Sequence, residues 1–584
     1  MATDPLLDWL HGAADRGSGV GAPTGAEAFR WLVGAGADAA TATPGSAGAE
    51  AESGPGAATA PSIFLPGNTS STYPGYVRPA TSGTATLLIN GRSSGGTGPN
   101  TDLTEPIDRM QEVVQSLRSG DRCYLSAWFF EPATMLTRGR YAGLSTWGEL
   151  LARKADEGVV IRILINDFDP VSGMDQWLQR DDLDRLNPLI AGLPVARRDN
   201  LKYVVSLHPA NVGPIKALLA TGQLRAVHVA SHHQKFMVCL RGEETIAFCG
   251  GLDIESRKTP AKWAPATGLF GWHDVHVMLT GPIARDLRRE FVMRWNREKD
   301  SSTRRPLPGW REHETLALPP QLRDTDVDME PGRRRHWIQM VRTASSDAIF
   351  SPYSNDRDDI RRIYANIVGA AREHLFLENQ YFRSLDLADA LARAGRARPG
   401  LIAIFVVVAS AAEDDGENAV TAHGAYLQHE FFRRVMAAFG PRARVYTMTR
   451  RAVHSKLLLA DDRYACVGSA NANDRSFELD SELNVAIDDA AVVGGWRRRL
   501  WTHDLGVPGA VVDSWPVSSY LRGWDATARA NLALELAGRI DDMTGEGVVP
   551  HDWTASRGSR SSAIPDALAH LDFDARRDDR PRLA

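Results

Sequence analysis

Residues 454–461 read HSKLLLAD, and shortly after them residues 468–471 read GSAN. A histidine and a lysine two positions apart point to the same face of a β-strand, while the apolar residues around them pack into a core. A Gly-Ser-x-Asn turn can bring small side chains and backbone donors beside an anion. The pattern therefore predicts a strand that carries His454 and Lys456 into an anion-binding site.

A related pattern occurs earlier in the chain. Residues 233–240 read HQKFMVCL, and residues 250–253 read GGLD. The histidine and the lysine are intact, but Leu240 stands at the position that Asp461 occupies in the later copy. Each half has an H-x-K strand, a second apolar strand and a Gly-rich turn in the same order, which indicates an internal duplication, and the period of about 220 residues is far too long for a solenoid.

The residues around both copies show apolar periodicities of two kinds. Helices are predicted at 107–117, 144–155, 360–371 and 385–394, and strands at 123–130, 159–165, 374–377 and 401–408. Strands that alternate with helices indicate an α/β fold in which helices cover a mostly parallel sheet.

Length and composition limit the class of protein. With 584 residues the chain is too long for one ordinary core, and 43% hydrophobic and 24% charged residues are typical of a soluble globular protein. A net charge of -5 argues against a general nucleic-acid binder, although a locally basic groove is compatible with it. The boundaries expected are 1–95 for an N-terminal extension (flexible at 33–60), 96–300 for a first domain, 301–335 for a linker, 336–525 for a second domain and 526–584 for a C-terminal tail.

Several features bear on the compartment. The four cysteines lie in apolar runs without C-x-x-C spacing, which predicts buried free thiols in a reducing compartment. The N-terminus lacks the pattern of a signal peptide, and the longest apolar run, 401–412, is too short to span a bilayer. We therefore expect a cytoplasmic protein, or one exported without a classical signal, that has no transmembrane segment.

Two H-x-K motifs on one chain resemble the phospholipase D superfamily, whose signature is H-x-K-x4-D. Further stretches resemble its eukaryotic-type, lipid-hydrolysing branch: HHQK at 232–235, GGLD at 250–253, WHD at 272–274, GPIA at 281–284, RW at 294–295, ENQYF at 378–382 and NDRS at 473–476. The resemblance covers roughly residues 100 to 525. It implies two tandem α/β/α domains related by pseudo-twofold symmetry, with the active site at their interface.

The resemblance also implies a division of labour between the histidines. His233 is expected to attack the phosphorus and form a phosphohistidine. His454 is expected to protonate the leaving alcohol and then to activate water or another alcohol. Imidazole titrates near neutrality, so one ring can be neutral while the other is protonated. Lys235 and Lys456 would neutralise the non-bridging oxygens, and this scheme requires no metal or other cofactor.

Each histidine also needs an acceptor for its second ring nitrogen, and in the family a carboxylate downstream of each motif has this role. Asp274 is the matching residue in the first half and Glu482 in the second. We expect Asp274 to support His233 and Glu482 to support His454. Asp461 is included among the site residues as the carboxylate of the complete motif.

The Gly-rich turns complete the predicted site. Ser469, Asn471 and Asp253 are expected to contact the substrate phosphate. The loss of the motif aspartate at Leu240 either reshapes a strand end or marks an inactive copy, and we favour an active one. The neighbouring Glu243 or Glu244 is a candidate replacement.

The predicted function is hydrolysis of a glycerophospholipid at a membrane surface, releasing phosphatidic acid and the head-group alcohol, or transfer of the phosphatidyl group to another alcohol. A nuclease on the same fold is the first alternative, because the chemistry at phosphorus is the same. A cardiolipin-type phosphatidyltransferase and a non-catalytic binding protein are further alternatives. No stable nucleic-acid partner is expected, and a monomer is compatible with the sequence. The aromatic segment 262–272 fits a lipid-contacting lip or ordinary loop packing.

Overall fold

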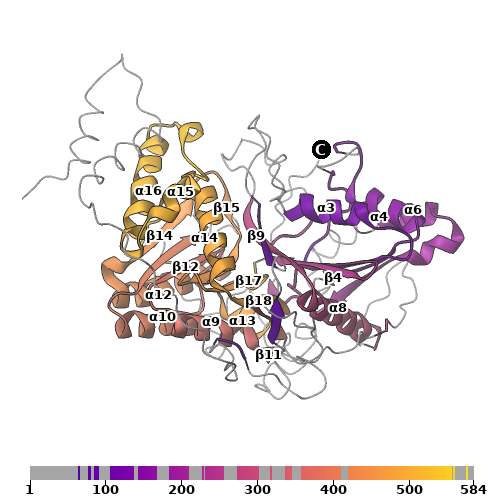
Figure 1. The fold of residues 1–584 in the computed structure, drawn as a ribbon, viewed down its shortest axis with the longest axis horizontal. Coiled ribbons are helices and arrows are strands. Elements are labelled where there is room, and N and C mark those ends of the chain that lie inside the picture. Colours follow the sequence, from indigo (N-terminus) through magenta and orange to yellow (C-terminus); the bar gives the residue numbers. More distant parts are fainter. Residues whose placement is uncertain are drawn as a thin grey trace, which may run out of the picture.

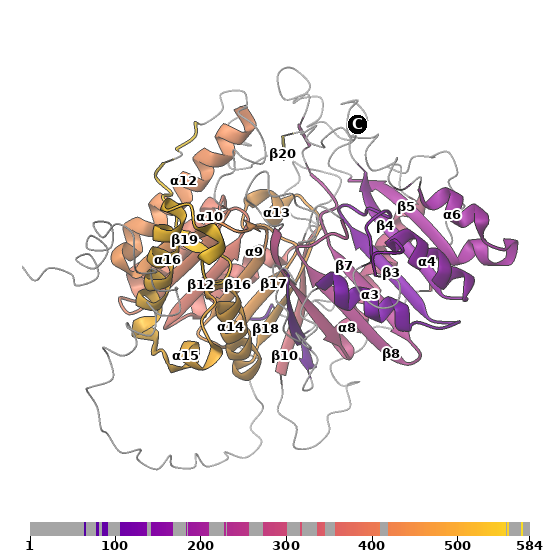
Figure 2. The same cartoon turned by 90° about the horizontal axis from the view of Figure 1, so that it is seen from above.

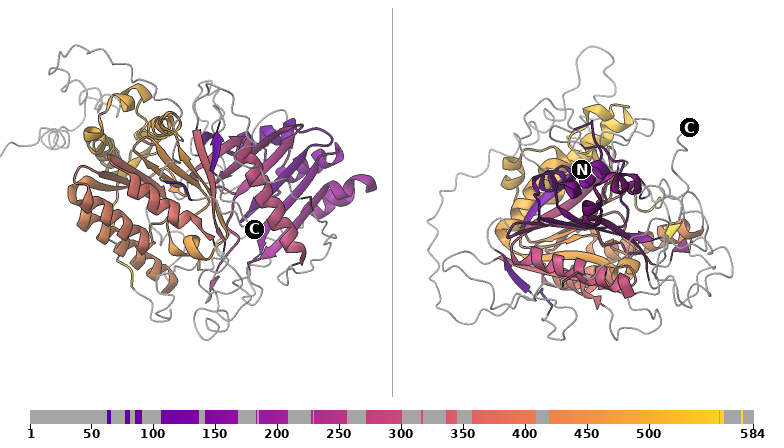
Figure 3. Two further views of the ribbon diagram at one scale, coloured as in Figure 1. Left: turned by 60° about the horizontal axis from the view of Figure 1, so that its bottom comes forward. Right: turned by 90° about the vertical axis from the view of Figure 1, so that its right-hand side faces the viewer.

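The computed structural model describes residues 63–65, 77–80, 85–90, 106–136, 142–167, 183, 185–208, 227–228, 230–255, 272–300, 316–317, 336–344, 357–408, 419–555, 557–559 and 574–575. Its two large β-sheets adjoin along one seam, with most strands of the first half of the chain in one sheet and most strands of the second half in the other (Figure 1). Figure 3 shows the same two halves from two further directions.

The first sheet has the strand order β15-β9-β8-β7-β3-β4-β5, with β2 paired to β9. Its strands are β2 (Ala85–Asn90), β3 (Arg122–Ala127), β4 (Val160–Asp167), β5 (Leu201–Leu207), β7 (Phe236–Arg241), β8 (Glu244–Gly250), β9 (Trp272–Thr280) and β15 (Ala452–Val453). The last of these, β15, comes from the second half of the chain, so the first sheet already crosses the seam.

The second sheet has the order β1-β10-β18-β17-β16-β12-β13-β14-β19, with β11 paired to β10. Its strands are β1 (Val77–Ala80), β10 (His336–Ala344), β11 (Arg357–Asp358), β12 (His374–Asn379), β13 (Ile402–Val407), β14 (Ala443–Met448), β16 (Lys456–Ala460), β17 (Tyr464–Gly468), β18 (Glu482–Asp488) and β19 (Val548–Pro550). The run β9-β8-β7-β3-β4-β5 and the run β18-β17-β16-β12-β13-β14 follow the chain in the same order. A third, small pair joins β6 (Val227–His228) and β20 (Asp574–Ala575).

The expectation of mostly parallel sheets is wrong, because both sheets are mixed. The strands β3, β4 and β5 are parallel, as are β12, β13 and β14. However, β7 and β16, which follow the two H-x-K motifs, run antiparallel to β3 and β12. Short turns join β7 to β8 and β16 to β17 without a crossover helix, and a short turn can only produce an antiparallel pair.

Helices cover both faces of each sheet (Figures 1 and 2). On the first sheet α3 (Pro106–Ser116), α4 (Trp147–Asp156) and α6 (Leu186–Gly192) pack on one face and α8 (Pro282–Asp300) on the other. On the second sheet α9 (Asp359–Ala370), α10 (Leu385–Ala397) and α12 (Ala419–Phe439) lie opposite α14 (Ala490–Leu505), α15 (Gly509–Ser514) and α16 (Tyr520–Leu536). All eight helices and strands predicted above are present, with ends shifted by only a few residues.

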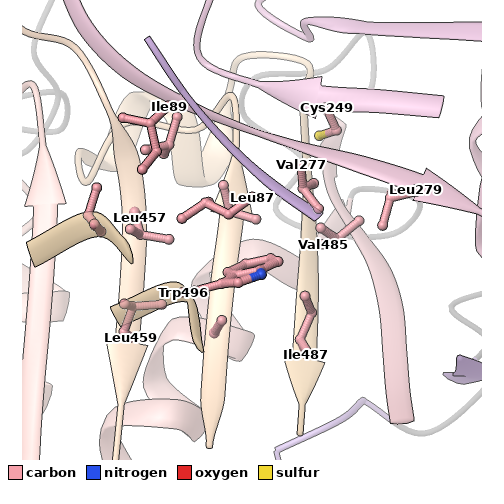
Figure 4. Close-up of a cluster of buried hydrophobic side chains, with 14 of the residues drawn as sticks. Leu87, Ile89, Cys249, Val277, Leu279, Leu457, Leu459, Val485, Ile487 and Trp496 are labelled. Carbon is pink, nitrogen blue, oxygen red and sulfur yellow. The ribbon is translucent and has the colours of Figure 1, made fainter. Parts of the chain in front are cut away.

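One large apolar cluster lies between the two sheets and joins them (Figure 4). It brings together side chains of β2, β9, β16, β18 and α14: Leu87, Ile89, Val277, Leu279, Leu457, Leu459, Val485, Ile487 and Trp496. Full burial of one such side chain contributes about 1.5–3 kcal/mol. The two halves therefore share a core.

The expected boundary at 525/526 falls inside a helix, and the expected N-terminal extension contains one strand of each large sheet. Strands β1 and β2, from the expected N-terminal extension, pair with β10 and β9. Helix α16 runs without interruption through residues 525 and 526, and β19 of the expected tail pairs with β14. Apolar alternation in such short edge strands is too weak a signal to detect in the sequence.

The prediction for the cysteines is confirmed, and some other predictions concern residues that the structure does not describe. The four cysteines, Cys123, Cys239, Cys249 and Cys466, are buried and free, as predicted. Within the described residues, none of the helices combines the length and the apolar character needed to cross a bilayer. Residues 33–60, residues 262–271 and nearly all of 301–335 lie outside the described residues.

Asp461 was expected in the active site, and this is wrong. It lies in the turn after β16, at the opposite end of that strand from Lys456, and each strand residue adds about 3.3 Å. Its carboxylate accepts hydrogen bonds from the backbone N–H groups of Arg372, Glu373 and His374 at 2.6, 2.9 and 3.0 Å. Asp461 thus fixes the start of β12 against the end of β16.

The first half has a corresponding contact between a carboxylate and the backbone, although Leu240 stands at the position of the motif aspartate. Strand β7 continues through Leu240 to Arg241, so the position is a strand residue that pairs with Arg122. The carboxylate comes instead from Asp121, which accepts from the N–H of Gly242 at 2.8 Å. Glu244 pairs with Arg241 at the surface and does not replace the motif aspartate.

The substitution Asp461→Gly tests the structural role of this carboxylate. Glycine suits the left-handed backbone at this position (φ 54°), so the change removes three charge-assisted hydrogen bonds without straining the turn. Urea unfolding should give a loss of about 1–3 kcal/mol in the free energy of unfolding, and activity per folded molecule should stay close to wild type. The exposed Asp156→Ala is the control. Lost activity at unchanged stability would contradict the structural role and would indicate that Asp461 belongs to the active site.

Candidate active site

The two H-x-K segments meet at the seam between the sheets. His233 lies just before β7, and Lys456 is the first residue of β16, with His454 just ahead of it. Both histidines thus lie in the approach to a strand, and not on the strand as predicted. Each approach is hydrogen-bonded to the opposite half of the chain: the N–H of His454 donates to the carbonyl of His273, and the N–H of Ser481 donates to that of Ser231.

Each histidine is paired with a carboxylate from the opposite half. His454 Nδ1 lies 2.6 Å from Asp274 Oδ2, and His233 Nδ1 lies 2.8 Å from Glu482 Oε1. The predicted pairing of each histidine with the carboxylate of its own half is therefore wrong. An ionised carboxylate only accepts hydrogen bonds, so Nδ1 carries the proton in each ring and Nε2 is left to act on a substrate.

Strand register explains the exchange. Parallel pairing of β15 with β9 sets Val453 opposite His273, so the next residues, His454 and Asp274, become neighbours. On the other side of the site a parallel bridge sets His232 opposite Ser481, which brings His233 beside Glu482. The two crossed pairs follow from these two short backbone contacts.

Burial differs between the members of each pair. The side chains of Asp274 and Glu482 are 0% exposed, whereas those of His233 and His454 are 12% and 6% exposed. The carboxylates are therefore fixed supports, and the rings are the groups that remain accessible to a ligand. A half-buried tryptophan flanks each ring: the Trp272 ring lies 4.0 Å from that of His454, and the Trp128 ring 5.9 Å from that of His233.

The two lysines are buried beside the histidines. Lys235 Nζ donates to the carbonyl of His233 at 3.1 Å and lies 3.8 Å from Asp253 Oδ2. Lys456 Nζ donates to the carbonyl of His454 and lies 3.4 Å from Gln380 Oε1. The site therefore holds two ammonium groups at low solvent exposure, where a positive charge interacts strongly with a phosphate.

The Gly-rich turns support the carboxylates. Ser469 Oγ donates to Glu482 Oε2 at 2.5 Å, and Ser476 Oγ donates to Glu482 Oε1 at 2.7 Å. The hydroxyl proton of Ser469 is thus used in the hydrogen bond to Glu482. In this structure Ser469 supports Glu482 and does not point its proton at a phosphate, contrary to the prediction. Gly251 occupies the matching position in the first half, where a Cβ would lie 2.5 Å from Asp274 Oδ1.

Asp253 and Asn471 differ in their surroundings. Asp253 Oδ1 accepts from the backbone N–H groups of Trp128 and Phe129 at 3.0 and 3.2 Å, and its other oxygen faces Lys235. A buried carboxylate repels an anion, so Asp253 orients Lys235 and is not a phosphate ligand as predicted. Asn471 is buried, and its Oδ1 has no hydrogen-bond partner within the described chain. A contact between Asn471 and phosphate stays a prediction.

The charges around His233 favour its neutral form. Burial and the nearby ammonium groups of Lys235 and Lys456 hold the pKa of His233 well below its usual range. Burial raises the pKa of Glu482, while the two lysines and the two serine hydroxyls act in the opposite direction. A neutral ring with its proton on Nδ1 presents a lone pair on Nε2, which is the form that a nucleophile requires.

Three residues that contact the site were not predicted as site residues from the sequence. Ser476, Trp128 and Gln380 touch the site histidines, lysines or carboxylates from separate turns. The one signal for Gln380 was its place in the ENQYF stretch, and the signal for Ser476 was its place in NDRS. Trp128 lies in no motif, and only the parallel β3 strand end brings it to the site.

The crossed pairing can be tested by double-mutant cycles in stability. Asp274→Asn combined with His454→Ala should show a coupling free energy of about 0.5–3 kcal/mol, because the two side chains share a buried hydrogen bond. Asp274→Asn combined with His233→Ala should be additive within about 0.5 kcal/mol. Urea unfolding of the single and double variants measures both quantities. Coupling of Asp274 to His233 and not to His454 would contradict the crossed arrangement.

Comparison with known proteins agrees with these features. The family described as cardiolipin synthase, PLD-like domain, matches residues 364–503. Phospholipase D2 of Bos taurus is 22% identical over 480 residues, which are 64% of this chain and 47% of the relative. Phospholipase D A of Dictyostelium discoideum is 24% identical over 499 residues, 68% of this chain and 35% of the relative.

This chain therefore spans less than half the length of these two relatives. Among solved structures, phosphatidylserine synthase of Haemophilus influenzae Rd KW20 is 14% identical with a TM-score of 0.47, over 80% of this chain and 97% of the other. The match to the PLD-like domain includes His454 and Lys456, and the matches to phospholipases D extend over a larger part of the chain. Residues 364–503 are therefore similar to a PLD-like domain, and about two thirds of the chain is similar to phospholipases D.

Proposed function

We propose that this protein is a phospholipase D-type phosphodiesterase that acts on glycerophospholipids. It would hydrolyse them to phosphatidic acid and the head-group alcohol, or transfer the phosphatidyl group to another alcohol. The observation that carries the proposal is the pair of histidines, each oriented by a buried carboxylate of the opposite half and each beside a buried lysine. The two sheets with the same strand order would be the two domains of the family, related by an approximate twofold axis.

In the first step Nε2 of neutral His233 would attack the phosphorus. The bond between phosphorus and the head-group oxygen would break, and His454 would deliver its Nε2 proton to that oxygen as the alcohol leaves. His233 would then carry the phosphatidyl group through an N–P bond. Lys235 and Lys456 would stabilise the negative charge on the non-bridging oxygens throughout.

In the second step the proton moves in the opposite direction. His454, now neutral, would take a proton from water or from an acceptor alcohol while that oxygen attacks the phosphorus. The N–P bond would break, which restores neutral His233 and protonated His454. Asp274 lies 2.6 Å from the ring of His454 and would stabilise its imidazolium form in both steps.

The choice of a lipid substrate rests on other observations. The relatives named above are phospholipases D by name, and the GGLD, WHD and ENQYF stretches resemble their branch. The net charge of -5 is unfavourable for long nucleic-acid polyanions. The substrate would be met at a membrane surface, from the cytoplasm or after export. A phosphatidyltransferase that joins two lipids is the second candidate, because the matching family is described as cardiolipin synthase, PLD-like domain.

A substrate comparison tests this proposal. Purified full-length protein should release phosphatidic acid from mixed phospholipid vesicles and should leave single- and double-stranded DNA uncut. His454→Ala should lower lipid turnover at least about 100-fold, because a positioned general acid–base contributes about 10²–10⁴-fold. His429→Ala on α12 is the matched histidine control and should keep wild-type turnover. DNA cleavage that is lost in His454→Ala, with lipids untouched, would overturn the lipid assignment.

A further inference from the structure

A second polar cluster lies next to the proposed active site and takes no part in the proposed reaction. We call it the buried His/Asp cluster, and it consists of His273, His503, Asp504, Glu378 and Glu546. His273 comes from β9, Glu378 from β12, the neighbours His503 and Asp504 from the end of α14, and Glu546 from the loop before β19. Strands from both sheets and a helix thus bring their polar side chains to one buried point.

The geometry of the cluster suits a shared ion. One ligand atom each of His273, His503 and Asp504 lies within 4.8 Å of the other two. Zinc ligands lie about 2.0–2.2 Å from the ion, so two ligands of a tetrahedral site are about 3.3–3.6 Å apart, and the most widely separated atoms of the cluster would move together by at most about 1.5 Å. Glu378 Oε1 is in contact with His273 Nε2, which places a fourth ligand beside the three.

Several buried polar atoms of the cluster lack a hydrogen-bond partner among the described residues. Within the described chain, both carboxylate oxygens of Asp504, Oε2 of Glu378 and Nδ1 of His273 are buried without a hydrogen-bond partner. A buried polar atom left unsatisfied costs about 1–3 kcal/mol, and a charged one costs more. Most buried polar atoms in native proteins have a partner, so these oxygens need either a cation or protons.

The net charge of the cluster also indicates that it needs a cation or protons. The cluster has three carboxylates, those of Glu378, Asp504 and Glu546, and among the described residues the guanidinium of Arg451 binds one of them, that of Glu546, at 2.6 Å. With both imidazoles neutral the cluster would have two surplus negative charges, and one divalent cation neutralises them. The alternative is protonation: the carboxylates outweigh burial and raise the pKa of His273 to about 9, and burial followed by Glu378 raises that of Asp504 well above its usual range.

We propose that the buried His/Asp cluster binds one divalent transition-metal ion of the zinc type, held by His273, His503 and Asp504 with Glu378 as the fourth ligand. Mixed imidazole and carboxylate ligands suit zinc, whereas calcium and magnesium prefer oxygen ligands alone. All four ligands come from the protein and are buried or nearly so, as in a closed structural site. The ion would stand outside the phosphoryl-transfer chemistry.

An ion in this cluster would affect the active site, because its ligands lie next to Asp274 and His454. His273 precedes Asp274, and the carbonyl of His273 accepts from the N–H of His454 at 2.8 Å. Ser455, the residue after His454, donates to Glu378 Oε1 at 2.5 Å. An ion bound by His273 and Glu378 would therefore join β9 to β12 and α14 across the seam and hold the Asp274–His454 pair in register.

Metal analysis of the full-length protein tests the proposal without an activity assay. Protein produced in zinc-supplemented medium should contain about one zinc per chain by mass spectrometry of the metal. Removal of zinc with a strong chelator should lower the Tm by several degrees, and added ZnCl2 should restore it. CoCl2 added to the stripped protein should give the visible absorption of cobalt with nitrogen and oxygen ligands. Absence of bound metal, together with a Tm that neither chelator nor ZnCl2 changes, would overturn the proposal.

Asp504→Asn separates the metal from the protonated network. If the ion is present, this variant loses a charged ligand and should lose zinc, the cobalt spectrum and several degrees of Tm. If protons alone balance the cluster, the change removes no hydrogen bond made by Asp504 and should leave the Tm unchanged or raise it. His429→Ala lies outside the cluster and should retain zinc. Should Asp504→Asn fail to fold, the CoCl2 titration of wild-type protein still decides the question, and none of these readouts depends on the identity of the substrate.

Discussion

The crossed pairing of histidines and carboxylates is the constraint on which the rest of the structure depends. His233 is held by Glu482 and His454 by Asp274, so neither half of the chain contains a complete site. The halves must therefore be fixed to one another to within a fraction of the length of a hydrogen bond. The apolar cluster between the sheets, β2 at the seam and the insertion of β15 into the first sheet all serve this requirement. An error in the register of one of these short parallel contacts would separate the pair that this contact forms.

The two halves share a strand order but have become unequal at the site. Glu482 is supported by the hydroxyls of Ser469 and Ser476, whereas Asp274 packs against Gly251, where no side chain fits. The charges differ as well, because two lysines and burial hold His233 in its neutral form. A reaction that needs one nucleophile and one proton donor is served by two rings in different environments. Each half thus supplies one histidine, and the local differences are what would assign them separate tasks.

Part of this arrangement could be predicted from the sequence, and the rest could not. The positions of His233, His454 and the two lysines follow from local pattern, as do the strands and helices around them, because apolar periodicity is a local property. Which carboxylate faces which histidine depends on strand pairing between residues far apart in the chain, and spacing carries no information about it. Likewise Asp121 replaces the lost motif aspartate from a different turn, a contact that only the register of β3 with β7 reveals.

The most direct test of the account is to locate the covalent intermediate. A phosphatidyl ester of a phenol with low pKa needs no general acid to leave, so His454→Ala should still complete the first step and should stall before the second. An acid-labile phosphatidyl group on His233, identified by peptide mass after rapid quenching at alkaline pH, is the predicted result. A phosphatidyl group on another residue, or turnover of this ester without any covalent enzyme, would contradict the two-histidine mechanism.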